Sequence, residues 1–386
     1  MEKNVIVLGA GLVGAAMARD LSGDPRFSVT LADIDPESLA RASEGFNMRT
    51  VCRDLSDPLS VKEIVKPFEM VINAMPGFMG FQTFRSVIEA GKDIVDIAFF
   101  IEDPLPLDEL ARKNNVTAVM DCGVAPGMCN VLIGYANQLL DKTESVVYYV
   151  GGLPEIREWP YEYKAVFSPV DVIEEYTRPA RFIENGLPVV KPALSDPELM
   201  NFPGIGTLEA FNTDGLRSLV NTIKAPDMKE KTLRYPGHIE KMKVLRETGF
   251  FRTDEVDVQG KKMRPIDLTT KLLFPIWKFT EKDVDITVMK VVVEGLKSGK
   301  RMRYTWDLFD RKDEKTGIHS MARTTGYTAT VALRMMADGV FTRKGVIVPE
   351  YFGEQPECVN YLLRGLAKRG VVYKESSEVA RSEIAK

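Results

Sequence analysis

Short apolar runs alternate with helix-forming stretches through the first third of the chain. The runs have strand length, and they lie at 4–8, 27–33, 48–53, 70–74, 94–98 and 116–121. Helical stretches separate the later runs, at 58–65, 81–90 and 107–114. Strands that alternate with helices imply parallel pairing with right-handed crossovers. Six strands within about 120 residues predict a doubly wound α/β sheet of the Rossmann type.

The pattern changes after Leu140, where strands follow one another locally. A strand is predicted at 144–152, and Asn185-Gly186 suits the two-residue turn of a hairpin over 180–190. Further hairpins are expected at 255–263 and 285–309, and helices at 239–247, 266–279 (broken or kinked by Pro275) and 320–338. Local connections indicate a second α+β domain with a mostly antiparallel, mixed sheet. We expect a Rossmann domain at 1–125, with 321–386 returning to pack on it, and a substrate-binding and dimerisation domain at 126–320.

Composition narrows the classes of function. The 386 residues hold 51 Lys and Arg against 55 Asp and Glu, a net charge of −4 that argues against nucleic-acid binding. No apolar run reaches the ~18–20 residues of a membrane span, and no signal peptide follows Met1, so a cytoplasmic protein is expected. Four Cys and two His lack the spacings of a disulfide framework or a metal site. A sheet open on one face favours a homodimer.

The glycines Gly9, Gly11 and Gly14 form a G-x-G-x-x-G motif between the first strand and the first helix. In that context they allow a tight turn, close approach of a pyrophosphate and close helix packing. Asp33, nineteen residues after Gly14, would bond the adenosine ribose and repel a 2′-phosphate, which favours NAD over NADP. Strand ends complete the predicted cofactor set: Gly9, Gly11, Leu12, Val13, Gly14, Asp33, Ile34, Asp54, Leu55, Asn73, Ala74 and Met75. For Asp54 and Asp57 the alternative is a turn or helix cap, and it is preferred for Asp57.

Three segments offer groups for chemistry. Asp121 ends the sixth strand on the nicotinamide side, with a helix cap as the alternative role. Arg234, Tyr235 and His238 gather around a Pro-Gly turn, where a guanidinium suits a carboxylate and an imidazole suits proton transfer. A third segment, 317–327, begins a helix whose polar side chains face either an anion or the core. The candidates are Asp121 and His238 for catalysis, and Arg234, Tyr235, Arg217, Arg323 and Asp96 for substrate binding.

Several of these motifs together resemble the saccharopine dehydrogenase-like family, most closely its lysine 6-dehydrogenase branch. The resemblance rests on 5–14 with 31–33, 121–127, 148–152, 208–211, 234–238 and 321–327. The glycine motif is unspecific, whereas the last two segments are far more specific. Residues 211–217 depart from the family pattern, in a loop that is expected to line the substrate pocket.

The resemblance implies a Rossmann domain, a mixed-sheet substrate domain, dimerisation and chemistry on a CH–NH₂ group or an imine. Arg234 and His238 would then be pocket residues and Asp121 a pocket carboxylate. The function expected is NAD-dependent oxidation of L-lysine to its 6-semialdehyde, which cyclises, with release of ammonia. One alternative is a reductase of the saccharopine or carboxyspermidine type that acts on a secondary amine. Another is an NAD-binding sensor without turnover.

Overall fold

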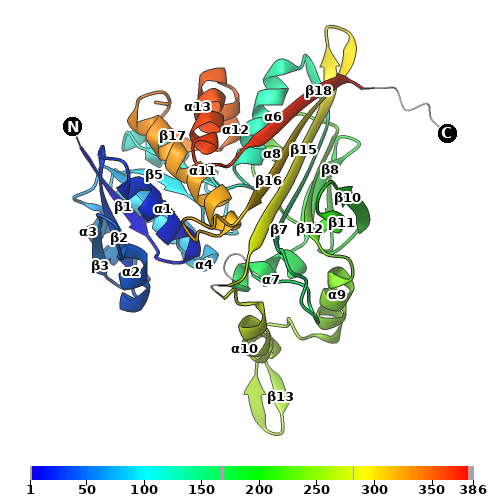
Figure 1. The fold of residues 1–386 in the computed structure, drawn as a ribbon, viewed down its shortest axis with the longest axis horizontal. Helices are drawn as coiled ribbons and strands as arrows, with labels where there is room; N and C mark the ends of the chain where they lie inside the picture. The colour runs from blue at the N-terminus through cyan, green and yellow to red at the C-terminus, as the bar shows by residue number, and fades with distance from the viewer. Residues whose placement is uncertain (1, 166–168, 281, 381–386) are drawn as a thin grey trace, which may run out of the picture. The chain divides into compact units, whose positions relative to one another are not determined.

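A computed structural model describes residues 2–165, 169–280 and 282–380. The chain divides into two compact units. The first unit comprises Met1–Gln138 and Met321–Tyr373, and the second comprises Leu139–Ser320 and Lys374–Lys386. Figure 1 follows the chain through both units, which are described separately below.

The first unit is built on a seven-stranded sheet in which every pair of neighbours is parallel (Figure 1). In spatial order the strands are β17 (Gly345–Ile347), β6 (Thr117–Val119), β5 (Asp93–Asp96), β4 (Met70–Asn73), β1 (Lys3–Leu8), β2 (Phe27–Asp33) and β3 (Arg49–Cys52). The run 5–8 of β1 is fully buried, as expected for a central strand covered on both faces. This order confirms the doubly wound fold class. The predicted six strands are present, and β17 adds a seventh that its short sequence did not signal.

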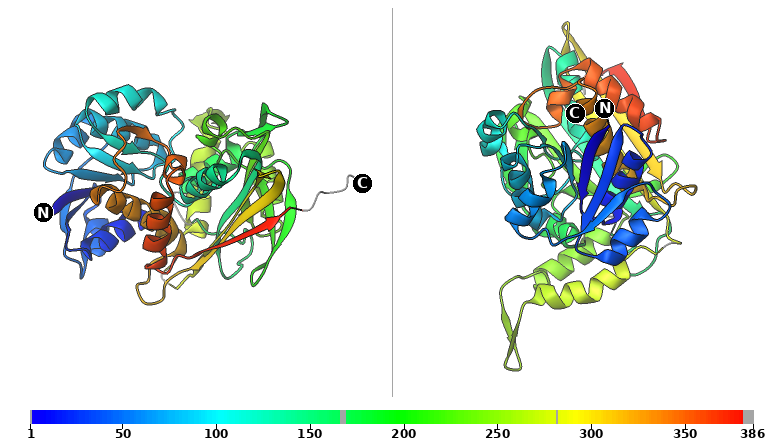
Figure 2. Two further views of the ribbon diagram at one scale, coloured as in Figure 1. Left: turned by 90° about the horizontal axis from the view of Figure 1, so that it is seen from above. Right: turned by 90° about the vertical axis from the view of Figure 1, so that its left-hand side faces the viewer.

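Helices connect these strands and cover the sheet (Figure 2). They are α1 (Leu12–Ser22), α2 (Pro36–Ser43), α3 (Pro58–Val65), α4 (Gly77–Glu89), the 3₁₀ turn η1 (Leu105–Leu107), α5 (Asp108–Lys113), α6 (Met128–Leu139), α11 (Ser320–Ala337), α12 (Glu350–Gly353) and α13 (Pro356–Ala367). Asp57 caps α3 by accepting from the N–H groups of Leu59 and Ser60, so the preferred cap assignment is confirmed. Helix α11 packs on α1, because a Cβ on Gly326 would lie 2.9 Å from Met17 Cγ.

The second unit contains a nine-stranded mixed sheet. Its main path runs β10 (Glu198–Phe202), β11 (Gly206–Asn212), β12 (Asp227–Arg234), β7 (Lys142–Pro154), β15 (Asp285–Lys297), β16 (Lys300–Arg311) and β18 (Tyr373–Val379), with β8 (Ala180–Glu184) on β12 and β9 (Leu187–Lys191) on β8. Among the pairs whose register is known, β12 and β7 are parallel and the others antiparallel. The predicted mixed sheet is therefore confirmed. Asn185 and Gly186 both have positive φ (51° and 77°), as the predicted type I′ turn requires.

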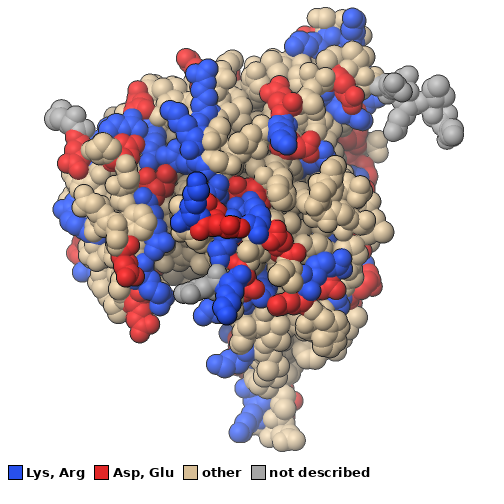
Figure 3. Space-filling model, in the orientation of Figure 1, with Lys and Arg blue, Asp and Glu red and all other residues tan. Residues whose placement is uncertain are grey.

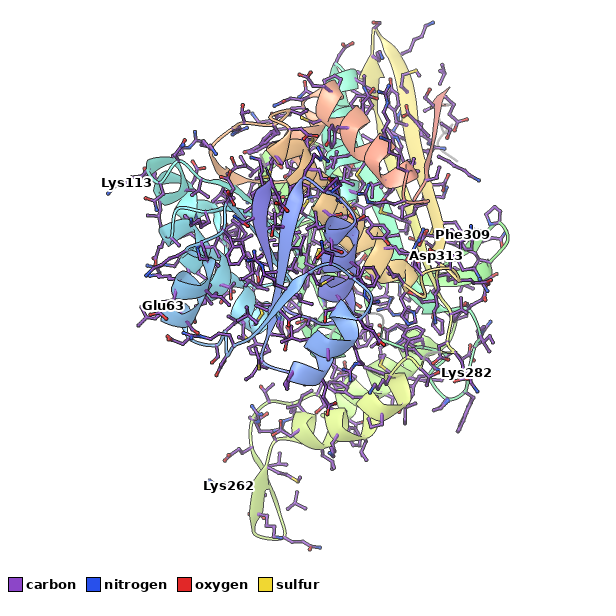
Figure 4. The ribbon with its side chains drawn as sticks, turned by 60° about the vertical axis from the view of Figure 1, so that its left-hand side comes forward. Glu63, Lys113, Lys262, Lys282, Phe309 and Asp313 are labelled. Carbon is purple, nitrogen blue, oxygen red and sulfur yellow. The ribbon has the colours of Figure 1, made fainter. Side chains whose placement is uncertain are left out.

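Among the described residues of the second unit, the remaining elements are four helices and a small hairpin. They are α7 (Pro169–Thr177), α8 (Leu219–Thr222), α9 (His238–Thr248), α10 (Pro265–Trp277), β13 (Val256–Val258) and β14 (Lys261–Met263). Pro275 lies inside α10, which continues to Trp277. Lys262 marks the β13–β14 hairpin, which extends away from α10 (Figure 4).

Two segments fall on the other side of the expected domain boundaries. Helix α6 belongs to the first unit, because its Gly134 meets Glu350 so closely that a Cβ would lie 2.4 Å from the Glu350 carbonyl oxygen. Strand β18 belongs to the second unit, because it extends the sheet beside β16. The expected boundaries at 125/126 and after 321 are therefore corrected for 126–138 and for 374–380.

The surface carries both signs of charge. Figure 3 shows Lys and Arg interspersed with Asp and Glu over the visible face. Within the described ranges, none of the helices has the length and apolar character needed to cross a membrane.

Candidate functional site

The glycine loop at the end of β1 has the geometry of a phosphate-binding turn. Gly9 has a φ of +102°, and a Cβ on Gly14 would lie 1.9 Å from the Gly9 carbonyl oxygen, so packing within the unit requires both glycines. Gly11 differs, because a Cβ there would meet nothing within 4 Å. It caps α1 without a side-chain hydrogen bond, which leaves backbone N–H groups at the start of that helix for an anion. The loop therefore fits the pyrophosphate of a dinucleotide.

Asp33 stands at the end of β2, beside this loop. Its Oδ2 accepts from the N–H of Ala10 at 2.6 Å, and its Oδ1 accepts from the N–H of Asp35 at 2.9 Å. These bonds fix the carboxylate and leave lone pairs on both oxygens. Ile34 is 63% exposed and Leu12 is 52% exposed, so both offer apolar surface near the loop. The arrangement fits the adenosine end of a dinucleotide.

The other predicted cofactor residues divide into exposed and buried groups. Asp54 is exposed and accepts from the N–H of Ser56, which lowers the pKa of its carboxyl. Leu55 lies in the hydrophobic core instead. Asn73 is fully buried, and its amide donates to Asp96 and to the Gly80 carbonyl. Its Oδ1 accepts from the N–H of Met75, and Ala74 meets Gly9 so closely that a Cβ on Gly9 would lie 2.7 Å from the Ala74 carbonyl oxygen. Val13 packs toward Gly326 of α11.

Two predicted carboxylates, Asp96 and Asp121, come together at the ends of β5 and β6. Asp96 is fully buried and accepts from the N–H of Ala98 at 2.8 Å, and Asp121 is 2% exposed with a left-handed φ of 51°. Burial raises the pKa of the Cys122 thiol, and the charges of both aspartates raise it further. Cys122 is therefore an inert thiol beside two carboxylates, and the carboxylates are the chemically significant groups at this point.

The second unit assembles a buried cluster around Arg234, which is 2% exposed at the end of β12. Its Nε donates to Tyr176 Oη at 3.3 Å, its Nη1 to the Leu233 carbonyl at 2.9 Å, and its Nη2 to Glu175 Oε2 at 2.5 Å. The guanidinium carbon lies 4.5 Å from the ring centroid of Tyr163, a cation–π contact. Burial raises the pKa of Glu175, and the adjacent guanidinium opposes that rise. Arg234 is therefore a fixed cation with an internal carboxylate partner.

His238 belongs to the same cluster, at the start of α9. The ring is 1% exposed, and its Nδ1 lies 2.9 Å from the Tyr161 carbonyl, so Nδ1 carries the proton. Its Nε2 then accepts from Tyr176 Oη, also at 2.9 Å. Burial, aided by the charge of Arg234, lowers the pKa of His238 to about 3. The imidazole is neutral at physiological pH, with Nδ1 engaged by the Tyr161 carbonyl and Nε2 by the Tyr176 hydroxyl that contacts Arg234.

Three other predicted substrate residues are Tyr235, Arg217 and Arg323. Tyr235 follows Arg234 in the chain and faces the opposite side of the sheet, where its hydroxyl donates to the Pro154 carbonyl at 2.9 Å. Arg217 is buried in the loop after β11 with a positive φ. Arg323 belongs to the first unit, where its Nη2 donates to the Arg369 carbonyl at 2.9 Å. The proposed grouping of Arg234 with Tyr235 is therefore corrected by strand alternation.

Sequence reasoning missed several members of the Arg234 cluster. Tyr163, Glu175, Tyr176 and Trp277 are all absent from the predicted set, although each contacts the cluster. The dense acidic and aromatic pattern of 171–176 on a short helix was the available signal. Nothing local to Tyr163 or Trp277 distinguishes them from core aromatics.

These features define a two-unit protein with a dinucleotide-binding fold in the first unit and a buried charged cluster in the second. Residues 5–119 match the family model of the saccharopine dehydrogenase NADP binding domain, and residues 123–371 match that of the saccharopine dehydrogenase C-terminal domain. The chain therefore belongs to the saccharopine dehydrogenase family, a group of oxidoreductases with an NAD(P)-binding domain. The family resemblance deduced from the sequence motifs is confirmed.

Individual relatives are distant. A saccharopine dehydrogenase [NADP(+), L-glutamate-forming] of Pyricularia oryzae is 25% identical over 325 residues, which cover 76% of this chain and 70% of the relative. The carboxyaminopropylagmatine dehydrogenase of Synechocystis is 23% identical, with 91% and 93% covered. The chain matches only 30% of the mouse α-aminoadipic semialdehyde synthase, at 25% identity over 69% of its own length. Yeast apo saccharopine dehydrogenase has the same fold, with a TM-score of 0.79 at 19% identity over 98% of this chain and 100% of the other.

Proposed function

We propose that the protein oxidises a primary amine on an amino acid with NAD⁺, and that L-lysine is its substrate. The observation that carries the cofactor assignment is the fixed carboxylate of Asp33 beside the open space over Gly11. A 2′-phosphate would meet this carboxylate and the partly exposed Asp35. Arg53, which follows β3, is already bonded to Ser60 and Glu63. The relatives whose names specify NADP therefore differ from this chain in the proposed cofactor.

The reaction requires loss of a proton before loss of hydride. An alkylammonium has a pKa of ~10.4, and only the neutral amine can release hydride to the nicotinamide. Hydride transfer from C6 leaves an imine, and water converts it to the semialdehyde and ammonium, with NADH and one proton as the other products. The semialdehyde then cyclises with its α-amino group. This order predicts a rate that rises from neutral to mildly alkaline pH.

We assign proton handling to Asp121 rather than to His238. A neutral imidazole with both nitrogens engaged and a pKa of about 3 is a weak base. Its contacts support a positioning role instead: His238 holds the Tyr176 hydroxyl, and Tyr176 in turn contacts Arg234. The pH–rate profile is then expected to lack an inflection near the ordinary histidine pKa of ~6.5.

A secondary-amine substrate is the second candidate, because the relatives include enzymes named for saccharopine and carboxyaminopropylagmatine. The test is reduced-nicotinamide absorbance with NAD⁺ or NADP⁺ and L-lysine, L-saccharopine or a diamine at alkaline pH. NADH and ammonia formed with L-lysine support the first proposal. A signal with saccharopine alone moves the chain to the second candidate, and silence despite NADH binding would favour a sensor.

We also propose that the protein is a homodimer through its second unit. The side chains of Leu268, Leu272 and Ile276 are exposed at intervals of four on α10, which supports an apolar contact with a second copy. Light scattering during size-exclusion chromatography measures the mass directly, and a monomer would contradict the proposal.

A further inference from the structure

The Arg234 cluster contains buried polar atoms that its own contacts do not satisfy. Tyr163 is 3% exposed and Trp277 is fully buried, yet neither Tyr163 Oη nor Trp277 Nε1 has a hydrogen-bond partner among the described residues. Their ring centroids lie 5.5 Å apart, and the Tyr163 ring also lies under the Arg234 guanidinium. A buried polar atom without a partner costs about 1–3 kcal/mol. These two atoms therefore point to a polar ligand in this cluster.

Arg234 has unused hydrogen-bonding capacity in the same place. A guanidinium has five N–H groups, and the bonds to Tyr176, Leu233 and Glu175 use three of them. One N–H on Nη1 and one on Nη2 remain. With Trp277 Nε1 and the Tyr163 hydroxyl they form a set of donors, and the ligand group that such a set prefers is a carboxylate.

Glu175 adds a negatively charged hydrogen-bond acceptor beside these donors. Its Oε2 accepts from Arg234, whereas its Oε1 is free of any such bond in the described structure, and its side chain is 19% exposed. A carboxylate oxygen with an exposed edge accepts readily from an ammonium. The pair of Arg234 and Glu175 is neutral overall, so a ligand with one positive and one negative group suits it better than an anion does.

We propose that Arg234 and Glu175 bind the zwitterionic α-amino and α-carboxylate groups of the substrate, with Glu175 selecting for the α-ammonium. The carboxylate lies on the donors of Arg234, Tyr163 and Trp277, and the ammonium lies on Glu175 Oε1. This proposal rests on the proposed function, because it assumes an amino acid whose reacting amine is distal to the α-carbon. Glu175 is thereby a specificity-determining residue that excludes acids without an α-amino group.

The test compares two ligands that differ only in the α-amino group, L-lysine and 6-aminohexanoate. Binding to the full chain saturated with NADH is measured by titration calorimetry, so that oxidation cannot take place. The wild-type protein is expected to bind L-lysine roughly 10- to 100-fold more tightly than 6-aminohexanoate, which is the factor expected for one charge-assisted hydrogen bond. The ratio of the two dissociation constants is the quantity compared between variants. Glu175→Gln is expected to bring that ratio close to one.

Two further variants separate charge from structure. Glu174→Gln alters the neighbouring carboxylate on α7, which is paired with Arg178 at 3.5 Å, and it is expected to keep the wild-type ratio. Glu175→Asp keeps the charge and is expected to keep part of the ratio. The proposal is overturned if the wild type has no preference, if Glu175→Gln retains it, or if Glu175→Asp and Glu175→Gln lose it equally. Failure of the proposed function is seen separately, as absence of NADH production from L-lysine by the wild type.

Discussion

Glu230 offers the sharpest quantitative prediction in the second unit. It is 4% exposed on β12, and its Oε2 accepts from the Thr213 hydroxyl and from the N–H of Gly215 at 3.1 Å. No cation forms an ion pair with it within the described ranges. Burial raises the pKa of its carboxyl from 4.5 to about 8, and the negative charges of Glu175 and Asp214 add to the rise. Glu230 is therefore protonated in the folded protein at neutral pH.

The sign of the effect on stability follows from that shift. Between pH 4.5 and about 8 the folded state holds a proton that the unfolded state has lost, so the free energy of unfolding falls as pH rises. The slope is about 1.4 kcal/mol per pH unit for one group. From about pH 5.5 to about pH 8 the loss is on the order of 3 kcal/mol, and it is complete above the folded-state pKa.

The perturbation is Glu230→Gln, which keeps the shape and removes the titration. Urea unfolding of the full chain, followed by tryptophan fluorescence at about pH 5.5 and about pH 8.5, gives the free energy of unfolding for each protein. From the lower to the higher pH, the wild type is expected to lose ~3 kcal/mol of unfolding free energy that the variant does not lose. Glu240→Gln, at a carboxylate 69% exposed on α9, is the control and is expected to follow wild type. A difference between Glu230→Gln and wild type that does not change with pH would refute the reasoning.

Three further predictions concern the first unit. Asp33→Ser removes the carboxylate that repels a 2′-phosphate, so the ratio of kcat/KM for NAD⁺ to that for NADP⁺ is expected to fall at least roughly 10-fold, and an unchanged ratio would contradict the cofactor assignment. Gly14→Ala places a Cβ 1.9 Å from the Gly9 carbonyl oxygen, so NADH binding followed by fluorescence titration is expected to be lost; retained binding would show that the loop is not required. Arg334→Met removes the buried guanidinium that pairs with Asp20 and Asp24, whereas these carboxylates keep Arg369 and Arg26 as partners, so thermal unfolding is expected to show a loss of about 1.5–3 kcal/mol; an unchanged transition would contradict a stabilising role for the Arg334 pairs.

The Rossmann half of the fold was accessible from the sequence because its signals are local. The glycine motif, the apolar runs and the Asp57-Pro58 cap each act within one turn or one strand, and Asn185-Gly186 fixes a hairpin in the same way. Short or exposed elements escaped prediction. Strand β17 is buried but has only three residues, too few for a recognisable pattern, and β18 is a largely exposed edge strand without an apolar run.

The environment of the site residues depended on contacts that are distant in sequence. His238 is held by Tyr176 and by the Tyr161 carbonyl, which are 62 and 77 residues away in sequence. The residues next to His238 therefore could not predict that its pKa is lowered. Leu55 was expected at the cofactor and lies in the core, because the packing of the neighbouring helices decides which side of a strand end is covered. The same applies to Glu175, whose partner Arg234 lies 59 residues further along the chain.

The central claim is that hydride passes from C6 of L-lysine to NAD⁺. The most direct measurement is mass spectrometry of the NADH formed when the protein acts on L-lysine carrying deuterium at C6, with L-lysine deuterated at C2 as the matched control. Deuterated NADH is expected from the C6-labelled substrate and unlabelled NADH from the control. Deuterium arriving from C2, or NADH that stays unlabelled with both substrates, would contradict it.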